Sequence, residues 1–322
     1  MLFTENTKSL ISVDLEKFKE IFSTAFRSEE KLLSKALDYL KPLNGKQIRP
    51  ILVLTSAKLC GKITENTHYL ASLFELMHCA SLIHDDVVDE AEQRRNRPSL
   101  NAIFDNRTSV LVGDFLMAKA ANFVYLTQNL EFLNIMQKLF THIVEGELYQ
   151  NEHSHNFISE EDYYRIIKQK TAALFAVCAA SGAMSAGANK QQIKALSNFG
   201  ENLGICFQIK DDIFDFTAKN IGKPVFNDVQ EGKVTLPLIN ALEQSNEKEQ
   251  DRIYDVINKD KINEHDKVFI VKLVQKYGGI KYAEKQMILY KEKAAKCLSV
   301  FEESPEKNLL LEMLNFAVER DF

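Results

Sequence analysis

The sequence has few of the residues that interrupt helices. Its 322 residues include only 12 glycines and 6 prolines, well below average usage. No series of short alternating apolar stretches bounded by Asn-Gly or Gly-rich turns occurs, so a β-sandwich or barrel is not predicted. Helical periodicity instead predicts an all-α bundle of long helices. With no repeat, low-complexity tract or linker to divide it, we expect residues 1–322 to form a single domain.

The sequence also lacks a strong charge of either sign. Its net charge is −5 at pH 7, with a pI of about 5.9. A general nucleic-acid-binding protein would carry a basic surface, so no nucleic-acid partner is expected. An anionic ligand must therefore be bound by local cations.

Cysteine usage and the N-terminus favour a cytoplasmic protein. The five cysteines are odd in number and have no C-x-x-C spacing, which is typical of free thiols in a reducing compartment. MLFTENTKSL has no charged segment followed by an apolar one, as a secretory signal would. Thr171–Asn189 carries no charge, but its many small residues predict a buried central helix and not a membrane span.

The most informative feature is an aspartate cluster, D-D-x-x-D, that occurs twice at the end of an apolar run. The six residues are Asp85, Asp86 and Asp89, and Asp211, Asp212 and Asp215. On a helix, positions i, i+1 and i+4 can turn toward one side. Crowded carboxylates repel and need a cation, and Mg²⁺ commonly bridges carboxylates and substrate phosphates. The pattern predicts two walls of one cavity that holds a metal-bound polyphosphate.

Three segments that break the helical pattern carry cations. They are Lys41–Arg49, Ala91–Pro98 and Thr217–Val234. Arginine binds phosphate oxygens with a bidentate fork and lysine with a point charge. Between these breaks the expected helices are Leu10–Phe26, Glu29–Tyr39, Pro50–Cys60, Asn66–Glu90, Ser109–Tyr125, Glu131–Gln150, Ser159–Ala188, Lys190–Phe216, Leu236–Gln244, Glu249–Asn258, His265–Lys276, Ile280–Glu302 and Pro305–Arg320.

The order of these motifs resembles that of the trans-prenyl diphosphate synthases (polyprenyl synthetases), over most of the chain. The segments that carry the resemblance are Gly45–Pro50, Glu75–Asp89 with Arg94-Arg95, Lys170-Thr171, Phe207-Gln208 with the second cluster, and Gly222–Lys233. The sequence departs from the family pattern at Asn44, Asn96, Ser99 and Phe226. These departures affect loop geometry and not the reaction.

The resemblance implies an isoprenoid-synthase type of fold, with long helices around a central apolar cavity, in a homodimer. It implies Mg²⁺-dependent condensation of isopentenyl diphosphate with an allylic diphosphate such as the farnesyl compound, and at most peripheral membrane contact during product release. The six aspartates would hold about three Mg²⁺ ions. Arg94, Lys170 and Lys233, with Lys223 nearby, would contact the allylic diphosphate, and Thr171 and Gln208 would face the reacting carbons. Lys46, Arg49, His78 and Arg95 would bind isopentenyl diphosphate.

The residues before the first cluster predict a long product. One helical turn advances about 5.4 Å, close to one isoprene unit, so the growing chain should pass Ser81 and Ala80, then Met77. Ser81 and Ala80 are too small to block it, whereas short-chain members of the family have bulky aromatics there. We therefore expect a product of about thirty to forty carbons for quinone side chains. A farnesyl or geranylgeranyl synthase is the alternative, and Phe123, Met136 or Phe140 would close the tunnel.

Other classes explain fewer of these motifs. Two E-x-x-H motifs, at Glu75 and Glu152, are typical of di-iron bundles but leave both aspartate clusters unexplained. His84-Asp85 resembles the motif of metal phosphohydrolases, without their further histidines. A class I terpene cyclase would need a different second motif. A non-catalytic partner subunit tends to lose the metal clusters that this chain keeps.

Overall fold

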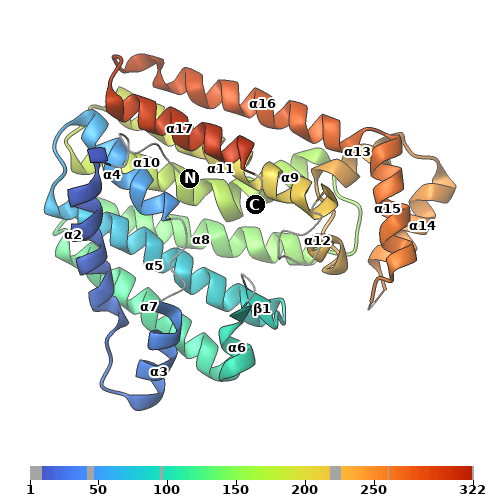
Figure 1. Ribbon diagram of the computed structural model, residues 1–322, viewed down its shortest axis with the longest axis horizontal. Coiled ribbons are helices and arrows are strands. Elements are labelled where there is room, and N and C mark those ends of the chain that lie inside the picture. The colour runs from blue at the N-terminus through green and yellow to red at the C-terminus, as the bar shows by residue number, and fades with distance from the viewer. Residues whose placement is uncertain (1–8, 42–46, 95–96, 218–225, 260, 321–322) are drawn as a thin grey trace. The chain divides into compact units, whose positions relative to one another are not determined.

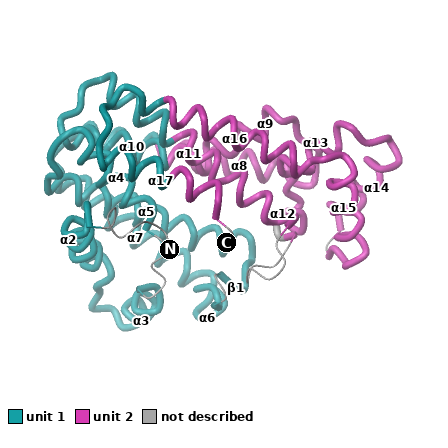
Figure 2. Tube along the Cα trace, turned by 45° about the horizontal axis from the view of Figure 1, so that its top comes forward, with its two compact units in different colours: residues 1–138, 175–200, 297–313 teal, residues 139–174, 201–296, 314–322 magenta. Residues whose placement is uncertain are grey.

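The computed structural model describes residues 9–41, 47–94, 97–217, 226–259 and 261–320 (Figure 1). In these ranges nearly every element is a helix, and the exception is one short hairpin. The predicted all-α fold class is therefore confirmed. The chain divides into two compact units (Figure 2): unit 1 comprises residues 1–138, 175–200 and 297–313, and unit 2 comprises 139–174, 201–296 and 314–322. The single domain stays a prediction.

Unit 1 contains the N-terminal helices and the hairpin. Its elements are α2 (Ser12–Ser23), η1 (Thr24–Phe26), α3 (Lys31–Leu40), α4 (Ile48–Cys60), α5 (Glu65–Val88), β1 (Gln93–Arg94), β2 (Arg97–Pro98), α6 (Leu100–Ile103), α7 (Asn106–Leu126) and η4 (Leu298–Val300). It also contains parts of α8 (Leu130–His153), α10 (Ala173–Ser185), α11 (Lys190–Thr217) and α17 (Pro305–Glu319).

Helix α5 forms the centre of unit 1 and packs against α4 and α7. A capping box between Thr64 and Thr67 fixes its first turn, because each side chain satisfies a backbone N–H of the other residue. Its middle is buried on all sides, because every residue from Leu70 to Met77 is buried. Helix α5 ends at the first aspartate cluster.

The uncharged stretch after Thr171 forms α10, which is buried as expected. Cys178 and Ala179 have no exposed surface, and the helix has 13 residues, fewer than a membrane span needs. A Cβ at Gly182 would lie 2.3 Å from the Val53 oxygen on α4. The small residues therefore allow close helix packing.

One described helix, α7, is long and apolar enough to cross a membrane by length and composition alone, with 39% of its most apolar window buried. Val112, Leu116 and Phe123 on its inner face are buried. Leu111 and Tyr125 are exposed.

Unit 2 contains the remaining helices. They are α9 (Glu160–Ile167), the π-helical turn η3 (Lys168–Ala172), α12 (Asn227–Gln230), α13 (Leu236–Gln244), α14 (Glu247–Ile257), α15 (Glu264–Lys276) and α16 (Gly279–Cys297), with the other parts of α8, α10, α11 and α17.

The expected single helix Ser159–Ala188 is wrong. The structure has α9, then the π-helical turn Lys168–Ala172, then α10, which ends at Ser185. A π turn widens the backbone by one residue and is often found at functional sites. Here it contains Lys170 and Thr171. A hydrophobic period cannot reveal such a turn, because apolar residues continue on both sides of it.

Candidate active site

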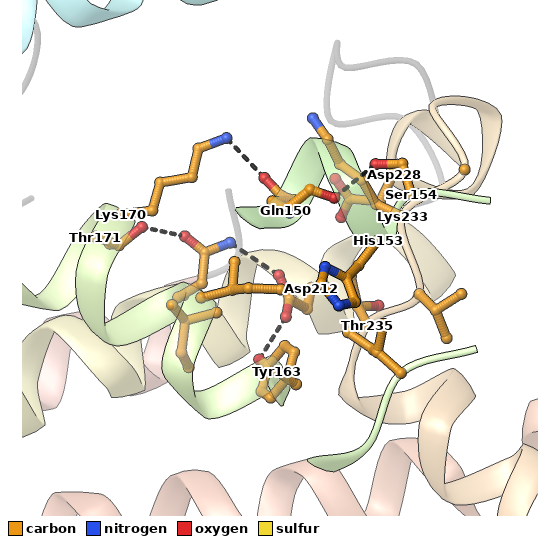
Figure 3. A pocket seen from close by; sticks show the side chains of 16 residues that line it. Gln150, His153, Ser154, Tyr163, Lys170, Thr171, Asp212, Asp228, Lys233 and Thr235 are labelled. Atoms are coloured by element: carbon orange, nitrogen blue, oxygen red, sulfur yellow. Dashed lines mark hydrogen bonds between the residues drawn. The ribbon is translucent and has the colours of Figure 1, made fainter. Parts of the chain in front are cut away.

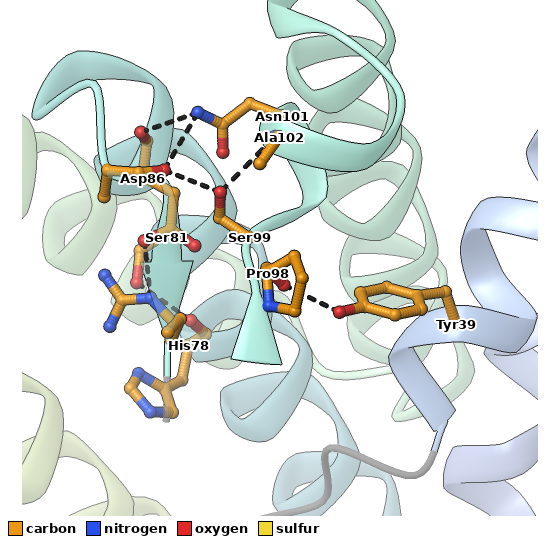
Figure 4. Close-up of polar contacts among 10 residues, drawn as sticks. Tyr39, His78, Ser81, Asp86, Pro98, Ser99, Asn101 and Ala102 are labelled. Atoms are coloured by element: carbon orange, nitrogen blue, oxygen red, sulfur yellow. Dashed lines mark hydrogen bonds and ion pairs between the residues drawn. The ribbon is translucent and has the colours of Figure 1, made fainter. Parts of the chain in front are cut away.

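The first aspartate cluster spans the last turn and the C-cap of α5, and its three carboxylates differ in exposure. Asp85 and Asp89 are half-buried, whereas Asp86 is 4% exposed. Arg94 on β1 donates from Nε to Asp86 Oδ1 at 2.6 Å (Figure 4). Burial raises the pKa of Asp86, and the Arg94 charge opposes that rise. Asp86 therefore anchors the cation-bearing hairpin, while its neighbours keep exposed surface.

Hydrogen bonds fix this hairpin against the end of α5 (Figure 4). The Asn101 side chain donates to the carbonyl oxygens of Asp86 and Ala91, at 3.3 and 3.1 Å. Ser99 Oγ donates to Ala91 O at 2.6 Å, and Tyr39 donates to Pro98 O at 2.6 Å. The turn after the first cluster is thus well connected to unit 1.

The residues expected to bind isopentenyl diphosphate are only partly described. Arg49 lies in the first turn of α4, with its guanidinium 5.1 Å from the Phe175 ring centre. His78 is half-buried on α5, and its carbonyl accepts from Ser81 Oγ at 3.0 Å. Lys46 and Arg95 lie outside the described residues, so their roles stay predictions.

The second aspartate cluster lies near the end of α11 and holds a hydrogen-bonded chain of side chains (Figure 3). Thr171 Oγ1 donates to Gln208 Oε1 at 2.8 Å. Gln208 Nε2 donates to Asp212 Oδ1 at 2.9 Å, and the Tyr163 hydroxyl donates to Asp212 Oδ2 at 2.5 Å. Asp212 is 1% exposed and Asp215 9%, whereas the Asp211 side chain is 28% exposed. Both oxygens of Asp212 are therefore engaged inside unit 2.

A cavity of about 90 Å³ adjoins this chain of hydrogen bonds. Its lining brings together five of the predicted site residues, from η3, α11 and the segment before α13 (Figure 3). They are Lys170, Thr171, Gln208, Asp212 and Lys233.

Both described lysines of this cavity pair with glutamates. Lys170 Nζ lies 2.5 Å from Glu147 Oε2 and donates to Gln150 Oε1 at 2.9 Å. Lys233 Nζ lies 2.5 Å from Glu231 Oε2. Lys223 lies outside the described residues. Both lysines line the cavity, so it has positive charge on its wall as well as carboxyl groups.

The cavity is lined by a second carboxyl group, that of the half-buried Asp228 on α12. Burial raises the pKa of Asp212, and the Asp228 charge raises it further, whereas the bonds from Tyr163 and Gln208 lower it. Burial likewise raises the pKa of Asp228, and the Lys233 charge opposes the rise. The site therefore concentrates negative charge that a bound cation would stabilise.

Sequence reasoning missed Asp228, Tyr163 and Gln150. Asp228 stands five residues before Lys233, which is a weak signal because a lone aspartate in a loop is common. Tyr163 lies about two helical turns before Lys170, and its hydroxyl reaches Asp212 only through the fold.

The donor set fits a metal that binds together with a diphosphate. In unit 1, Asp85 and Asp89 keep exposed surface, and in unit 2 Asp211 does. Among the residues that the structure describes, no group of three or more His, Cys, Asp or Glu side chains could hold a metal ion by itself. Mg²⁺ needs only one or two carboxylates when waters and substrate phosphates complete its coordination.

The residues expected to set product length lie in unit 1. Ala80 has no exposed surface, and Met77 and Phe123 are nearly buried. Ser81 and Met136 are half-buried. The Phe123 ring stacks on Tyr69, with 6.1 Å between ring centres. Their influence on product length stays a prediction.

Comparison with known proteins identifies the family to which this chain belongs. Residues 30–274 match the polyprenyl synthetase family. The chain belongs to this family. It is a prenyltransferase, as the order of its motifs predicted.

Individual relatives in the polyprenyl synthetase family cover the whole chain. The octaprenyl diphosphate synthase of Haemophilus influenzae is 32% identical, over 100% of this chain and 98% of its own length. A polyprenyl synthase from Caulobacter crescentus, solved with calcium and isoprenyl diphosphate, has a TM-score of 0.93 and 32% identity, covering 98% and 97% of the two chains. A geranylgeranyl pyrophosphate synthase from Bacteroides thetaiotaomicron has a TM-score of 0.84 and 36% identity, covering 97% and 98%.

Proposed function

We propose that this polyprenyl synthetase adds isopentenyl diphosphate repeatedly to an allylic diphosphate, such as the farnesyl compound, and makes a long all-trans polyprenyl diphosphate. The main support is that cations lie next to an aspartate of each cluster. Arg94 binds Asp86 of the first cluster, and Lys170 and Lys233 line the same cavity as Asp212 of the second. Anion-binding cations next to carboxylates that need a cation suit a metal–diphosphate ligand.

The aspartate clusters would bind about three Mg²⁺ ions with the allylic diphosphate, and the metal would neutralise the charge of the leaving group. All six aspartates belong to this proposal, and Asp85, Asp89 and Asp211 are its half-buried members. Arg94, Lys170 and Lys233 would give charge-assisted hydrogen bonds to the same diphosphate, with Lys223 nearby. Lys46, Arg49, His78 and Arg95 would bind isopentenyl diphosphate without metal.

Thr171 and Gln208 would stabilise the positive charge that develops on the allylic carbon. Their side chains are fixed relative to each other by the 2.8 Å hydrogen bond, and fixed dipoles stabilise charge without reorganisation. The double bond of isopentenyl diphosphate then attacks this carbon. The departed diphosphate accepts the proton, so no protein nucleophile is needed.

We infer a product of about thirty to forty carbons, suited to quinone side chains, because one turn of α5 matches about one isoprene unit and Ala80 is small. A geranylgeranyl-length product is the second candidate. The similarity to the Bacteroides enzyme supports it.

The proposed setting is the cytoplasm, as a homodimer that contacts membranes at most peripherally during product release. Free cysteines support a reducing compartment: all five are unbridged in the structure. The exposed apolar side chains of α7 support the dimer.

The test is incubation of the full chain with labelled isopentenyl diphosphate, farnesyl diphosphate and Mg²⁺, followed by dephosphorylation and chromatography. We expect labelled alcohols longer than geranylgeraniol, and none when a chelator removes the metal. Products that stop at geranylgeraniol would select the shorter alternative. No elongation from any allylic primer would refute the proposal.

A further inference from the structure

The end of the last helix contacts the first aspartate of the second cluster. Arg320 follows α17, and its backbone N–H still bonds to Phe316 O at 3.1 Å. Its side chain is 5% exposed. A guanidinium buried this deeply needs partners that compensate its lost hydration, and all of those described below belong to one stretch of α11 within unit 2.

Arg320 binds both the backbone and the side chain of a single turn of α11. Its Nη2 donates to Phe207 O at 2.7 Å and lies 3.2 Å from Asp211 Oδ1. In an α-helix, the carbonyl of residue 207 is the one to which the N–H of residue 211 bonds. The guanidinium therefore connects the start of this turn to the carboxylate at its end.

Two aromatic rings set the position of the guanidinium. Its carbon lies 3.6 Å from the Phe207 ring centre and 5.6 Å from that of Phe214. Arginine stacks on aromatic faces in a way that lysine does not. The side chain is thus restrained by stacking as well as by its polar contacts.

We propose that Arg320 is a positioning residue that fixes Asp211 for binding the metal–diphosphate ligand, an inference that rests on the proposed function. One side of Asp211 is turned to Arg320, and its 28% exposure leaves room for a second cation. Groups that orient a metal-binding carboxylate typically contribute about 10- to 100-fold in metal affinity or activity. The last helix would then belong to the catalytic apparatus and not only to the core.

Loss of the Arg320 charge has a second effect on cation binding, opposite in sign to the loss of positioning. Removing a positive charge beside Asp211 would by itself strengthen cation binding. Because Asp211 is partly exposed, water screens that gain, whereas an unrestrained carboxylate loses the orientation on which binding depends. We therefore expect the loss of orientation to dominate.

The experiment compares wild type, Arg320→Met, Arg320→Lys and the control Arg252→Met by titration with Mn²⁺ and inorganic diphosphate, followed by electron paramagnetic resonance. Arg252 also stacks on a phenylalanine, 3.7 Å from the Phe269 ring centre, but on α14, outside the aspartate clusters. We expect affinity for Mn²⁺ to fall about 10- to 100-fold in Arg320→Met and less in Arg320→Lys, with Arg252→Met unchanged. The kcat should fall in parallel, with the KM for isopentenyl diphosphate unchanged.

The outcomes separate this inference from the proposed function. Affinity in Arg320→Met equal to or tighter than that of wild type would overturn the positioning role. If Arg320→Met fails to fold, the Arg320→Lys variant is the test, because it keeps the positive charge and loses the planar guanidinium. Wild-type affinity for Mn²⁺ in that variant would overturn the inference. If wild type itself neither binds Mn²⁺ with diphosphate nor elongates an allylic primer, the proposed function fails instead.

Discussion

At the scale of single residues, neighbouring aspartates in one cluster have different surroundings. Asp212 accepts hydrogen bonds from Tyr163 and Gln208 and is 1% exposed, whereas Asp211 has an exposed side. The repeated D-D-x-x-D pattern predicted the site but treated its members as equivalent. The members differ in burial. Burial depends on which face of α11 packs inward, and the spacing of three identical residues cannot show that.

We expect Asp85→Ala and Asp211→Ala to reduce turnover by several orders of magnitude while the protein stays folded. Both side chains keep exposed surface, so their loss removes cation binding and leaves no cavity in the core. Steady-state kinetics with a melting curve for each variant would measure this. Asp114→Ala is the matched control, because Asp114 is 63% exposed and lies beside His84. Near-normal turnover in either cluster variant would contradict the two-cluster site.

Product length is also a single-residue question, centred on Ala80. We expect Ala80→Phe to shorten the product toward farnesyl or geranylgeranyl length, and Met136→Ala to lengthen it. Ala80 has no exposed surface, so the larger ring must displace neighbours, at a cost of about 1–3 kcal/mol. Chromatography of the dephosphorylated products and a melting curve distinguish a shortened chain from a damaged fold. A folded Ala80→Phe variant with an unchanged product would show that the chain does not pass this residue.

At the scale of elements, helical periodicity predicted most helices to within a few residues. Leu236–Gln244 was predicted with both ends correct, and the end of α4 at Cys60 was also correct. The π turn at Lys168–Ala172 and the Gln93–Pro98 hairpin were not predicted. Both depend on tertiary contacts: the π turn accompanies the Thr171–Gln208 bond, and the hairpin accompanies the Arg94–Asp86 pair.

The start of α15 should make stability depend on pH. The Asp266 side chain accepts from Lys259 Nζ at 2.6 Å, and this hydrogen bond, with the Lys259 charge, lowers the pKa of Asp266 below its ordinary 3.8. A lowered folded-state pKa gives stability that is complete above the unfolded-state pKa and is lost as the pH falls through the folded-state value. Below about pH 4, wild type should therefore lose more stability than Asp266→Asn.

Urea unfolding at pH 7, 5, 4 and 3 would measure this difference. Asp251→Asn is a suitable control, because Asp251 is an exposed aspartate on the adjacent helix α14. A constant difference in stability between wild type and Asp266→Asn at every pH would contradict the ion-pair explanation.

At the scale of the whole molecule, α7 and the start of α8 expose large apolar side chains that the described residues leave uncovered. The exposed fraction is 59% for Leu111, 71% for Tyr125 and 38% for Leu126, and it is 82% for Leu130 at the start of α8. Large contiguous apolar patches on a protein surface usually mark an interaction site. A second copy of the chain is the occupant that the resemblance to the family implies.

We therefore expect a homodimer at micromolar concentration in sedimentation analysis, and we expect Leu111→Asp combined with Tyr125→Asp to convert it to a monomer. A charge buried in an apolar interface without a partner costs several kcal/mol, and a symmetric dimer contains each substitution twice. Val268→Asp is the matched control, since Val268 is a 48% exposed apolar residue on α15. The same two proteins also test whether α7 binds membranes, in a flotation assay. If α7 inserts into a bilayer instead, wild type should co-float with neutral lipid vesicles and the double variant should not. A wild-type monomer that stays in solution and elongates substrate would contradict the dimer, because the face of α7 would then need no cover at all.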